Sequence, residues 1–269
     1  MLRRHSFSVA VIVSTASLNP GQFAHAQQPL ALAQVLDRNA SAMEGRARLD
    51  SLRSVVILRT RTSLFSLKLP HFVLVESSDS TGSLAYAEGS NGRQAWEQTR
   101  RDSIRRVVTG RPEIALRRVV QWPSTLLPLY RMAEYGHTLE LEGTETIDGV
   151  AYYRCRLTLS DGFQRWYFVN AESFRIERAR DTRELHANDG NTREMETLFS
   201  DYREVDGYWF PFTVVERDLR TGERLLGRTM LAIFPNAEVP DSLFGPAAGS
   251  TFARVEVFHV LADRSRRAR

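Results

Sequence analysis

Few residues of this 269-residue chain have the type and spacing of a reactive centre. Beyond residue 26 the histidines are His71, His137, His186 and His259, which are too scattered to suggest a metal site. No glycine-rich phosphate loop, GxSxG nucleophile motif or HExxH zinc motif is present. We therefore expect a protein that is not an enzyme and that holds no metal or other cofactor.

Two arrangements of polar residues could still carry acid–base chemistry. His186 lies close to Asp189, but both fall in an expected hairpin loop. Glu194 and Glu196 are two residues apart, so they share one face of a strand, and paired carboxylates can act as acid and base. No cleft partner is evident in the sequence, and a solvated strand face is the favoured interpretation.

The single cysteine, Cys155, rules out an internal disulfide. Cys155 alternates with Tyr153, Leu157 and Leu159 on one face of an expected strand. This pattern favours a small buried hydrophobic residue over a reactive thiol. The chain must then be stabilised by its apolar core, which a chain of this length can form.

A basic stretch runs from residue 100 to residue 118. It contains Arg100, Arg101, Arg105, Arg106, Arg111, Arg117 and Arg118, interspersed with Val107, Val108 and Ile114. A solvated helix face or loop is the favoured interpretation. The alternative is a contact for anionic lipid headgroups or for an acidic partner surface.

Large apolar residues occur on both faces of two expected strands. Trp166 and Phe168 share one face of a strand, and Tyr167 lies on the other. The segment 208–212, Tyr-Trp-Phe-Pro-Phe, is similar. A strand that is apolar on both sides needs two covers. One cover can be helices, and the other can be a second layer of core or a bound ligand.

Turn signals predict an antiparallel sheet around these residues. Asn-Gly and Asp-Gly pairs favour tight hairpins because both residues tolerate positive φ. They occur at 91–92, 148–149, 161–162 and 206–207. The turn at 91–92 would join the expected strands 84–88 and 93–99, the turn at 161–162 would join 152–159 and 163–169, and the turn at 206–207 would join 198–205 and 208–216. Further strands are expected at 54–62, 72–75, 225–234 and 252–261, and a helix at 30–43. Residues 112–135, with Pro112, Pro123 and Pro128, predict one or two short helices within the strand order.

The N-terminus has the order of a secretory signal. Arg3, Arg4 and His5 precede an apolar stretch of about twelve residues, too short to span a bilayer comfortably, and Ala24-His25-Ala26 fits a cleavage site. Removal of residues 1–26 would take the formal net charge from +4 to +2. We expect a soluble periplasmic protein with one domain over residues 27–262, a basic disordered tail at 263–269 and no nucleic acid partner.

In order, these segments resemble the periplasmic outer-membrane lipoprotein carriers and sorting proteins, the LolA/LolB-like group. The likeness covers roughly residues 30–245. It includes the helix over 35–43, the strand over 55–62, the Lys-Leu-Pro-His-Phe segment at 68–72, and the hairpin from Tyr86 to Trp96. It continues through Gly-Thr-Glu-Thr-Ile-Asp-Gly at 143–149, then 152–161, and Ser-Asp-Tyr-Arg at 200–203 followed by Gly207 and Pro211. The arginine-rich insert at 100–118 departs from the compact carriers.

The resemblance implies a mainly β fold: an antiparallel, incomplete β-barrel with an N-terminal helix and a short helical lid formed by residues 112–135. The implied cavity receives lipoprotein acyl chains or another lipid, and Arg59 or Arg61 could match an arginine that holds the lid in the carriers. The residues expected to bind the acyl chain are Val55, Ile57, Arg59, Trp96, Leu126, Leu127, Tyr130, Met132, Trp166, Phe168, Phe210 and Phe212.

The resemblance implies lipoprotein transport by a monomeric carrier that exchanges its cargo with membrane-protein donors or acceptors. The main alternative is an envelope-stress sensor or interaction protein on the same scaffold, with the arginine-rich segment as its docking face. A hydrolase with an unfamiliar site is a third possibility, and it would require His137 or His186 to meet a carboxylate or hydroxyl in a cleft.

Overall fold

The computed structural model describes residues 30–247 apart from 71, 82, 103, 124–125 and 185–189. The expected signal sequence, the expected strand at 252–261 and the expected tail lie outside the described residues, as do His71, His186, Asp189 and His259.

The chain begins with the expected amphipathic helix. Helix α1 spans Leu32–Ala42 and buries Val35 and Ala40, and Gln34 caps it by accepting a hydrogen bond from the Ala31 backbone at 2.9 Å. Gly45 ends the helical turn with φ 86°, a conformation that glycine adopts without steric cost, and its N–H donates to the Ala40 carbonyl at 2.7 Å. A short second helix, α2 (Arg46–Asp50), was not predicted.

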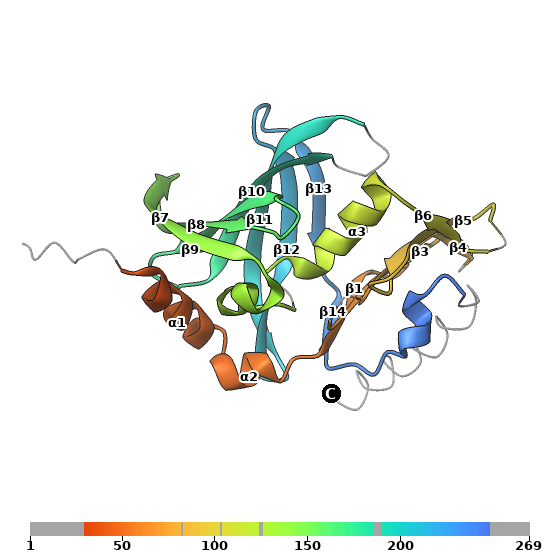
Figure 1. Ribbon diagram of the computed structural model, residues 1–269, viewed down its shortest axis with the longest axis horizontal. Coiled ribbons are helices and arrows are strands. Elements are labelled where there is room, and N and C mark those ends of the chain that lie inside the picture. Colours follow the sequence, from red (N-terminus) through yellow and green to blue (C-terminus); the bar gives the residue numbers. More distant parts are fainter. Residues whose placement is uncertain are drawn as a thin grey trace, which may run out of the picture.

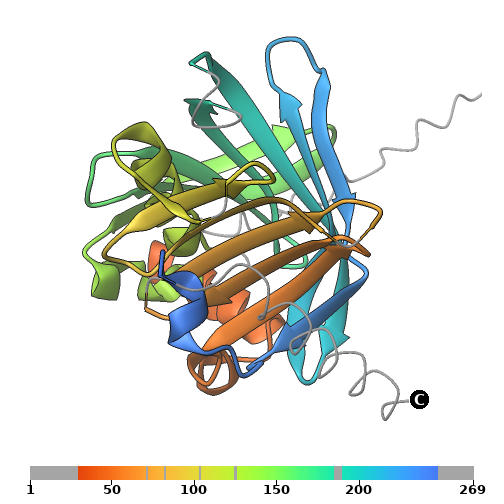
Figure 2. The same cartoon turned by 90° about the vertical axis from the view of Figure 1, so that its right-hand side faces the viewer.

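Two antiparallel seven-stranded sheets follow (Figures 1 and 2). The first sheet has the order β14-β1-β2-β3-β4-β5-β6, and the second has the order β13-β12-β11-β10-β9-β8-β7. The strands of the first are β1 (Ser54–Thr60), β2 (Ser63–Lys68), β3 (Phe72–Ser78), β4 (Leu84–Ser90), β5 (Ala95–Thr99), β6 (Arg106–Val108) and β14 (Ala232–Pro235). Those of the second are β7 (Thr138–Ile147), β8 (Val150–Thr158), β9 (Gln164–Asn170), β10 (Ile176–Glu184), β11 (Thr192–Val205), β12 (Tyr208–Asp218) and β13 (Arg224–Thr229).

The two sheets meet at a corner between β13 and β14. Here the Met230 N–H donates to Phe212 of the second sheet at 2.7 Å, and the Leu231 N–H donates to Leu58 of the first at 2.8 Å. The opposite edges, β6 and β7, are the outer strands of their sheets and are connected through helix α3 (Arg111–Gln121) and the 3₁₀ helix η1 (Leu129–Tyr135). Figure 1 shows α3 between the sheets on this side. The expected incomplete β-barrel with a few helices is confirmed.

The outer face of the first sheet is covered by the segment that follows β14. The side chains of Val56, Leu74 and Trp96 pack there against Phe244, which belongs to the 3₁₀ helix η2 (Asp241–Phe244). Figure 2 shows η2 lying across the strands. This cover explains why the strands of the first sheet are apolar on both faces.

The hairpins expected at 91–92, 148–149, 161–162 and 206–207 are confirmed, and at 148–149 and 206–207 both turn residues have positive φ. The expected single strand at 225–234 is wrong: it breaks at the corner, and its two halves join different sheets. Strands β2, β6, β7 and β10 have no counterpart among the expected strands. Within residues 30–247, as far as they are described, no helix has the length and hydropathy needed to cross a membrane.

Candidate ligand-binding cavity

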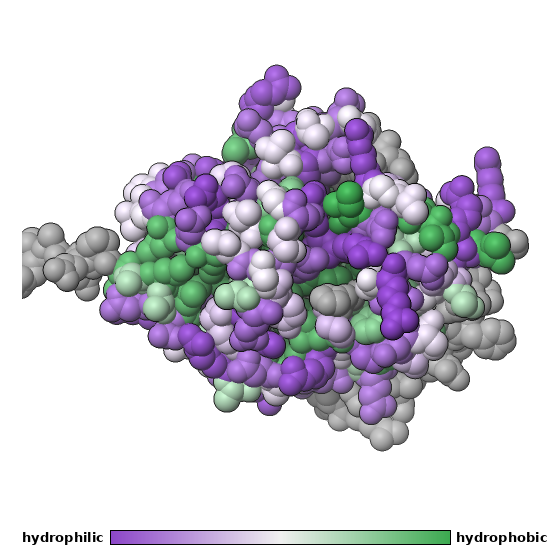
Figure 3. All heavy atoms as spheres, in the orientation of Figure 1, coloured by the Kyte–Doolittle hydropathy of each residue, from purple (hydrophilic) through white to green (hydrophobic). Residues whose placement is uncertain are grey.

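A cavity of about 740 Å³ lies between the two sheets and beneath α3. This volume falls in the range that encloses a small organic ligand. Ile114, Leu116 and Val119 of α3 line it from one side. In the space-filling view, apolar residues are visible in the middle of this face and are surrounded by hydrophilic ones (Figure 3).

The first sheet forms an apolar floor. Val55, Leu67 and Val73 lie opposite one another on β1, β2 and β3, and Ile57, Phe65 and Val75 form the next cross-strand row. Of these, all except Val55 line the cavity. Since side chains alternate between faces along a strand, one parity of residues on each strand builds the whole floor.

The second row ends in two acidic residues. Val75 lies opposite Glu88, and Glu88 lies opposite Glu97, so both carboxylates share the inner face. Both line the cavity. The Tyr86 hydroxyl donates to Glu88 Oε2 at 2.7 Å. The floor is therefore apolar over β1–β3 and polar over β4 and β5.

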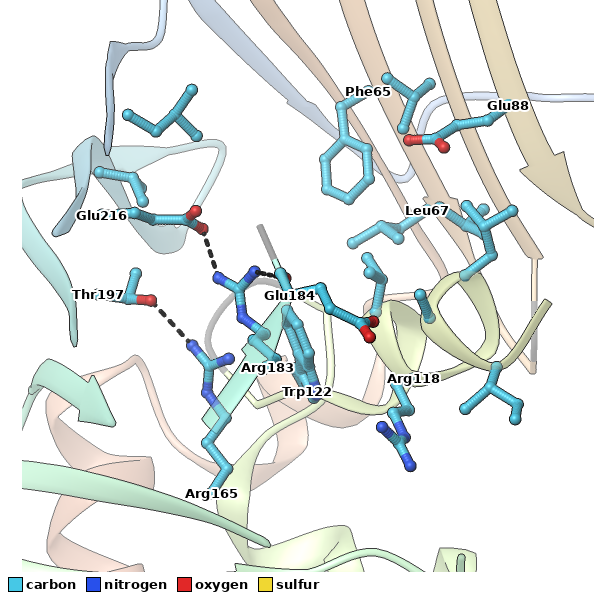
Figure 4. Close-up of a pocket in the computed structure, with 18 of the residues that line it drawn as sticks. Phe65, Leu67, Glu88, Arg118, Trp122, Arg165, Arg183, Glu184, Thr197 and Glu216 are labelled. Atoms are coloured by element: carbon cyan, nitrogen blue, oxygen red, sulfur yellow. Dashed lines mark hydrogen bonds and ion pairs between the residues drawn. The ribbon is translucent and has the colours of Figure 1, made fainter. Parts of the chain in front are cut away.

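The second sheet supplies a charged wall that faces this floor (Figure 4). Arg165 donates to Asp181 Oδ2 at 2.6 Å and to Thr197 Oγ1 at 3.2 Å. Arg183 lies 3.1 Å from Asp181 and 3.1 Å from Glu216. Burial lowers the pKa of Arg165, but the Asp181 carboxylate opposes it, and the net direction is upward. Two cations and two anions therefore neutralise one another along this wall.

Trp122, just after α3, connects the helix to the charged wall. The Arg165 guanidinium lies 4.3 Å from its ring and that of Arg183 5.4 Å from it, and Phe163 stacks against it with ring centroids 6.4 Å apart. The ends of the helix are held by ion pairs, Arg111 with Glu184 at 3.3 Å and Arg118 with Asp161 at 2.7 Å. These contacts fix the helix over the cavity.

Arg59 enters the cavity from a β-bulge. The pairing of β1 with β2 shifts between Leu58 and Thr60, which leaves Arg59 without an opposite residue. Its guanidinium lies 4.1 Å from the centre of the Phe65 ring, and its Nε is buried without a hydrogen-bond partner among the described residues. Arg61, the alternative match to the arginine of the carriers, is exposed in the following turn.

Only two of the twelve residues predicted to bind an acyl chain, Ile57 and Arg59, line this cavity. Leu126, Leu127 and Phe210 instead surround a second, much smaller hollow of about 40 Å³ near α2 and η1. Val55 and Phe212 lie in the core cluster that also contains Ile57, and Met132 is buried in a separate cluster under α1.

The other four predicted residues face away from the cavity. The Trp96 indole N–H donates to the Phe244 carbonyl at 2.7 Å on the outer face of the first sheet. The Tyr130 hydroxyl donates to Asp50 at 2.6 Å. Trp166 and Phe168 lie on the outer face of the second sheet, where Trp166 donates to Glu142 and Arg180 lies over Phe168.

Glu196 lies on this same outer face, and the expectation that it is solvated is wrong. It has no exposed surface, and its carboxylate accepts hydrogen bonds from Arg180 at 2.9 Å and Arg217 at 2.6 Å. Arginine side chains thus provide the second cover over β9–β12, where the sequence suggested a ligand or more core. Glu194 is exposed, so the two glutamates do not form a matched pair.

The described histidine and the cysteine are both buried. His137 Nδ1 accepts a hydrogen bond from the Ser160 backbone at 3.2 Å, and burial lowers the pKa of its imidazole. Cys155 has no exposed surface, and burial raises the pKa of its thiol to about 12, as the structural interpretation of this residue predicts. In the part of the chain that the structure describes, no group of three or more metal-ligating side chains occurs.

The sequence interpretation missed most of the cavity wall. Phe65 and Leu67 belong to β2, which was not predicted; had the hairpin at 61–62 been recognised, they would have emerged as cross-strand partners of Ile57 and Val55. The charged residues Arg183, Glu216 and Arg228 had the alternation of a solvent-facing strand side. No signal in the sequence distinguished that side from a cavity wall.

Comparison with solved structures supports the fold. The chain is similar to a LolA superfamily protein from Nitrosomonas europaea, with a TM-score of 0.50 and 18% identity over 79% of this chain and 97% of the other. A DUF1329 family protein from Desulfovibrio piger gives a TM-score of 0.46 at 14% identity over 81% of this chain and 98% of the other. No protein-family model and no curated protein matches the chain. The predicted LolA-like resemblance is thus confirmed for the fold.

Proposed function

We propose that this protein is a periplasmic, non-enzymatic carrier that holds the acyl chain of a lipid or lipoprotein in the cavity between its sheets. The observation that carries the proposal is the floor of Ile57, Phe65, Leu67, Val73 and Val75 facing a cavity of about 740 Å³. The LolA-like fold supports it. Outer-membrane lipoprotein sorting is the specific role we propose.

The energetics of acyl chains favour such a cavity. Burying one methylene group stabilises a complex by about 0.8 kcal/mol, so a chain of about sixteen carbons gains on the order of 10 kcal/mol. A lipid that crosses an aqueous space therefore needs an apolar enclosure. We further propose that the carrier is monomeric and exchanges its cargo with membrane-protein donors and acceptors.

The test is uptake of an acyl ligand by the wild-type protein and by variants of the cavity wall. Native mass spectrometry of protein purified from the periplasm should show an adduct of lipid mass. Ile114→Glu should weaken binding of a fluorescent fatty-acyl probe without unfolding, because Ile114 lines the cavity and is 43% exposed. Val150→Glu is the matched control, since Val150 is 38% exposed on β8 and does not line the cavity. Absence of any acyl uptake by the wild type would reject the proposal.

An interaction role is the second candidate, and a surface near β6 favours it. Ile104 is 71% exposed and Val107 50% exposed, and Arg100 and Arg106 are exposed beside them. Figure 3 shows apolar side chains standing out over β5 and β6. An acidic surface on an envelope protein would complement this combination.

The test of this second role must leave Arg105 unchanged. Arg105 is buried, lies 3.7 Å from the Trp96 ring, and donates to the carbonyls of Leu243 and Gly245. Its loss would disturb the fold. Neutralising Arg100, Arg101 and Arg106 together should abolish a specific envelope interaction while acyl binding stays unchanged; unchanged capture of the partner would reject the role.

A further inference from the structure

Two arginines at one end of the cavity form no ion pair with any described residue. Arg59 and Arg228 both line the cavity, the charge of Arg228 helps to lower the pKa of Arg59, and the nearby acids are Glu216 and Glu88. Glu216 lies 3.1 Å from Arg183, and Glu88 accepts a hydrogen bond from Tyr86. Among the described residues, neither carboxylate forms an ion pair with Arg59 or Arg228.

Arg59 is a half-buried cation with no hydrogen-bond or ion-pair partner among the described residues. Its guanidinium rests on the Phe65 ring, and its Nε finds no acceptor in the described chain. Desolvation and the charge of Arg228 lower the pKa of Arg59 to about 9, so the group remains cationic at neutral pH. Removing part of a cation from water without a counter-ion has a desolvation cost, so an anionic ligand in the cavity is a favourable partner for Arg59.

Arg228 faces the same space from the second sheet. Arg228 belongs to β13 and lies opposite Val214 of β12. Strand β13 is an outer strand next to the corner where the sheets join. Burial lowers the pKa of Arg228, and Glu216 and Glu88 oppose this effect. Two guanidinium groups from different sheets therefore line one cavity whose floor is apolar over β1–β3.

We propose that Arg59 and Arg228 bind the anionic group of an amphiphile, a carboxylate or a phosphate, whose hydrocarbon chain lies along Ile57, Phe65 and Val75. This inference rests on the proposed carrier function and adds the chemistry of the ligand's polar end. Guanidinium groups suit both anions because each offers paired N–H donors. The anion replaces the missing acceptors of Arg59.

The experiment compares ligands that share a twelve-carbon chain and differ at one end. Laurate, monododecyl phosphate and uncharged methyl laurate compete for the full chain against a fluorescent neutral acyl probe. We expect at least one of the two anions to bind about tenfold more tightly than methyl laurate, as hydrogen bonds to charged groups require. A preference for laurate would point to a fatty acid, and a preference for the phosphate would point to a lipid phosphate.

Arg59→Gln and Arg228→Gln should each bring the anion-to-ester ratio close to one while methyl laurate binding is retained. Arg61→Gln, which removes the same charge from an exposed turn, should keep the wild-type ratio. Arg228 is only partly buried, so its variant tests the inference even if Arg59→Gln fails to fold. Equal binding of anions and ester by the wild type, or an unchanged ratio in Arg228→Gln, overturns the inference. Binding of none of the ligands would reject the carrier function itself.

Discussion

Gly89 and Trp96 lie opposite each other on β4 and β5, and the indole occupies the space beside the glycine Cα. A Cβ on Gly89 would lie 2.7 Å from Trp96 Cζ2 and 2.8 Å from the Val73 carbonyl oxygen. The backbone atom cannot move without disturbing β3. Position 89 therefore has to be glycine for the sheet and the indole to pack as they do.

Gly89→Ala should lower the free energy of unfolding by about 1–3 kcal/mol, the usual cost of overpacking. Urea denaturation followed by tryptophan fluorescence measures it. Gly245→Ala is the control, because a Cβ there meets its nearest atom, Asn91 Nδ2, at an ordinary 3.5 Å, and the backbone φ of −90° suits any residue. Equal stability of the two variants would contradict the packing argument.

Asp181→Asn should be among the most damaging substitutions of a polar residue. Asp181 and Arg165 are almost completely buried, with 1% and 3% of their side chains exposed, and the variant leaves Arg165 without its carboxylate. Removing one partner of a buried ion pair costs roughly 3–5 kcal/mol.

The matched control is Asp201→Asn, which breaks the exposed pair with Arg203. Exposed pairs contribute about 1 kcal/mol or less. Chemical denaturation of both variants tests the contrast, and a loss for Asp181→Asn no larger than for Asp201→Asn would refute it.

His137 should make the protein less stable as the pH falls. Burial lowers the pKa of His137 in the folded protein, whereas the unfolded chain takes up a proton near pH 6.5. The contribution is therefore fully present above about pH 6.5 and is lost as the pH decreases below that value. Urea unfolding at pH 7.5 and pH 5 should show a smaller decrease for His137→Gln than for the wild type; identical decreases would exclude His137 as the cause.

Cys155 should not react with a thiol reagent in the folded protein. Its side chain is buried, and burial raises the pKa of the thiol to about 12, so little thiolate is present at pH 8. Ellman's reagent should detect one thiol per chain in urea and almost none under native conditions. Rapid native labelling would show that the core around β8 opens readily.

The sequence was most informative where local chemistry determines structure. Asp148-Gly149 and Asp206-Gly207 predicted hairpins because both residues accept positive φ, and α3 begins where Pro112 and the apolar spacing placed a helix. The cavity wall was harder to predict because it depends on which face of each strand points inward. Trp166 and Phe168 were the natural choice for an apolar wall, yet arginines cover them on the outer face.

The ion pairs inside the cavity could not be predicted from local sequence patterns, because they also depend on which strand faces point inward. Arg183 and Glu216 come from strands far apart in sequence, and their pairing requires the register of β10, β11 and β12. Arg59 was singled out only by the family resemblance. Its position at a β-bulge depends on the pairing of β1 with β2.

The corner at Met230 and Leu231 joins the two sheets through backbone hydrogen bonds. Helix α3 packs mainly on β3, β4 and β5, so we expect it to move together with the first sheet. On the far side, Arg111–Glu184 and Arg118–Asp161 tie the helix to the second sheet, and these contacts are partly exposed. Because salt screens exposed ion pairs, we expect the acyl ligand of the proposed carrier to enter and leave the cavity faster as ionic strength rises, with the fourteen-stranded framework unchanged.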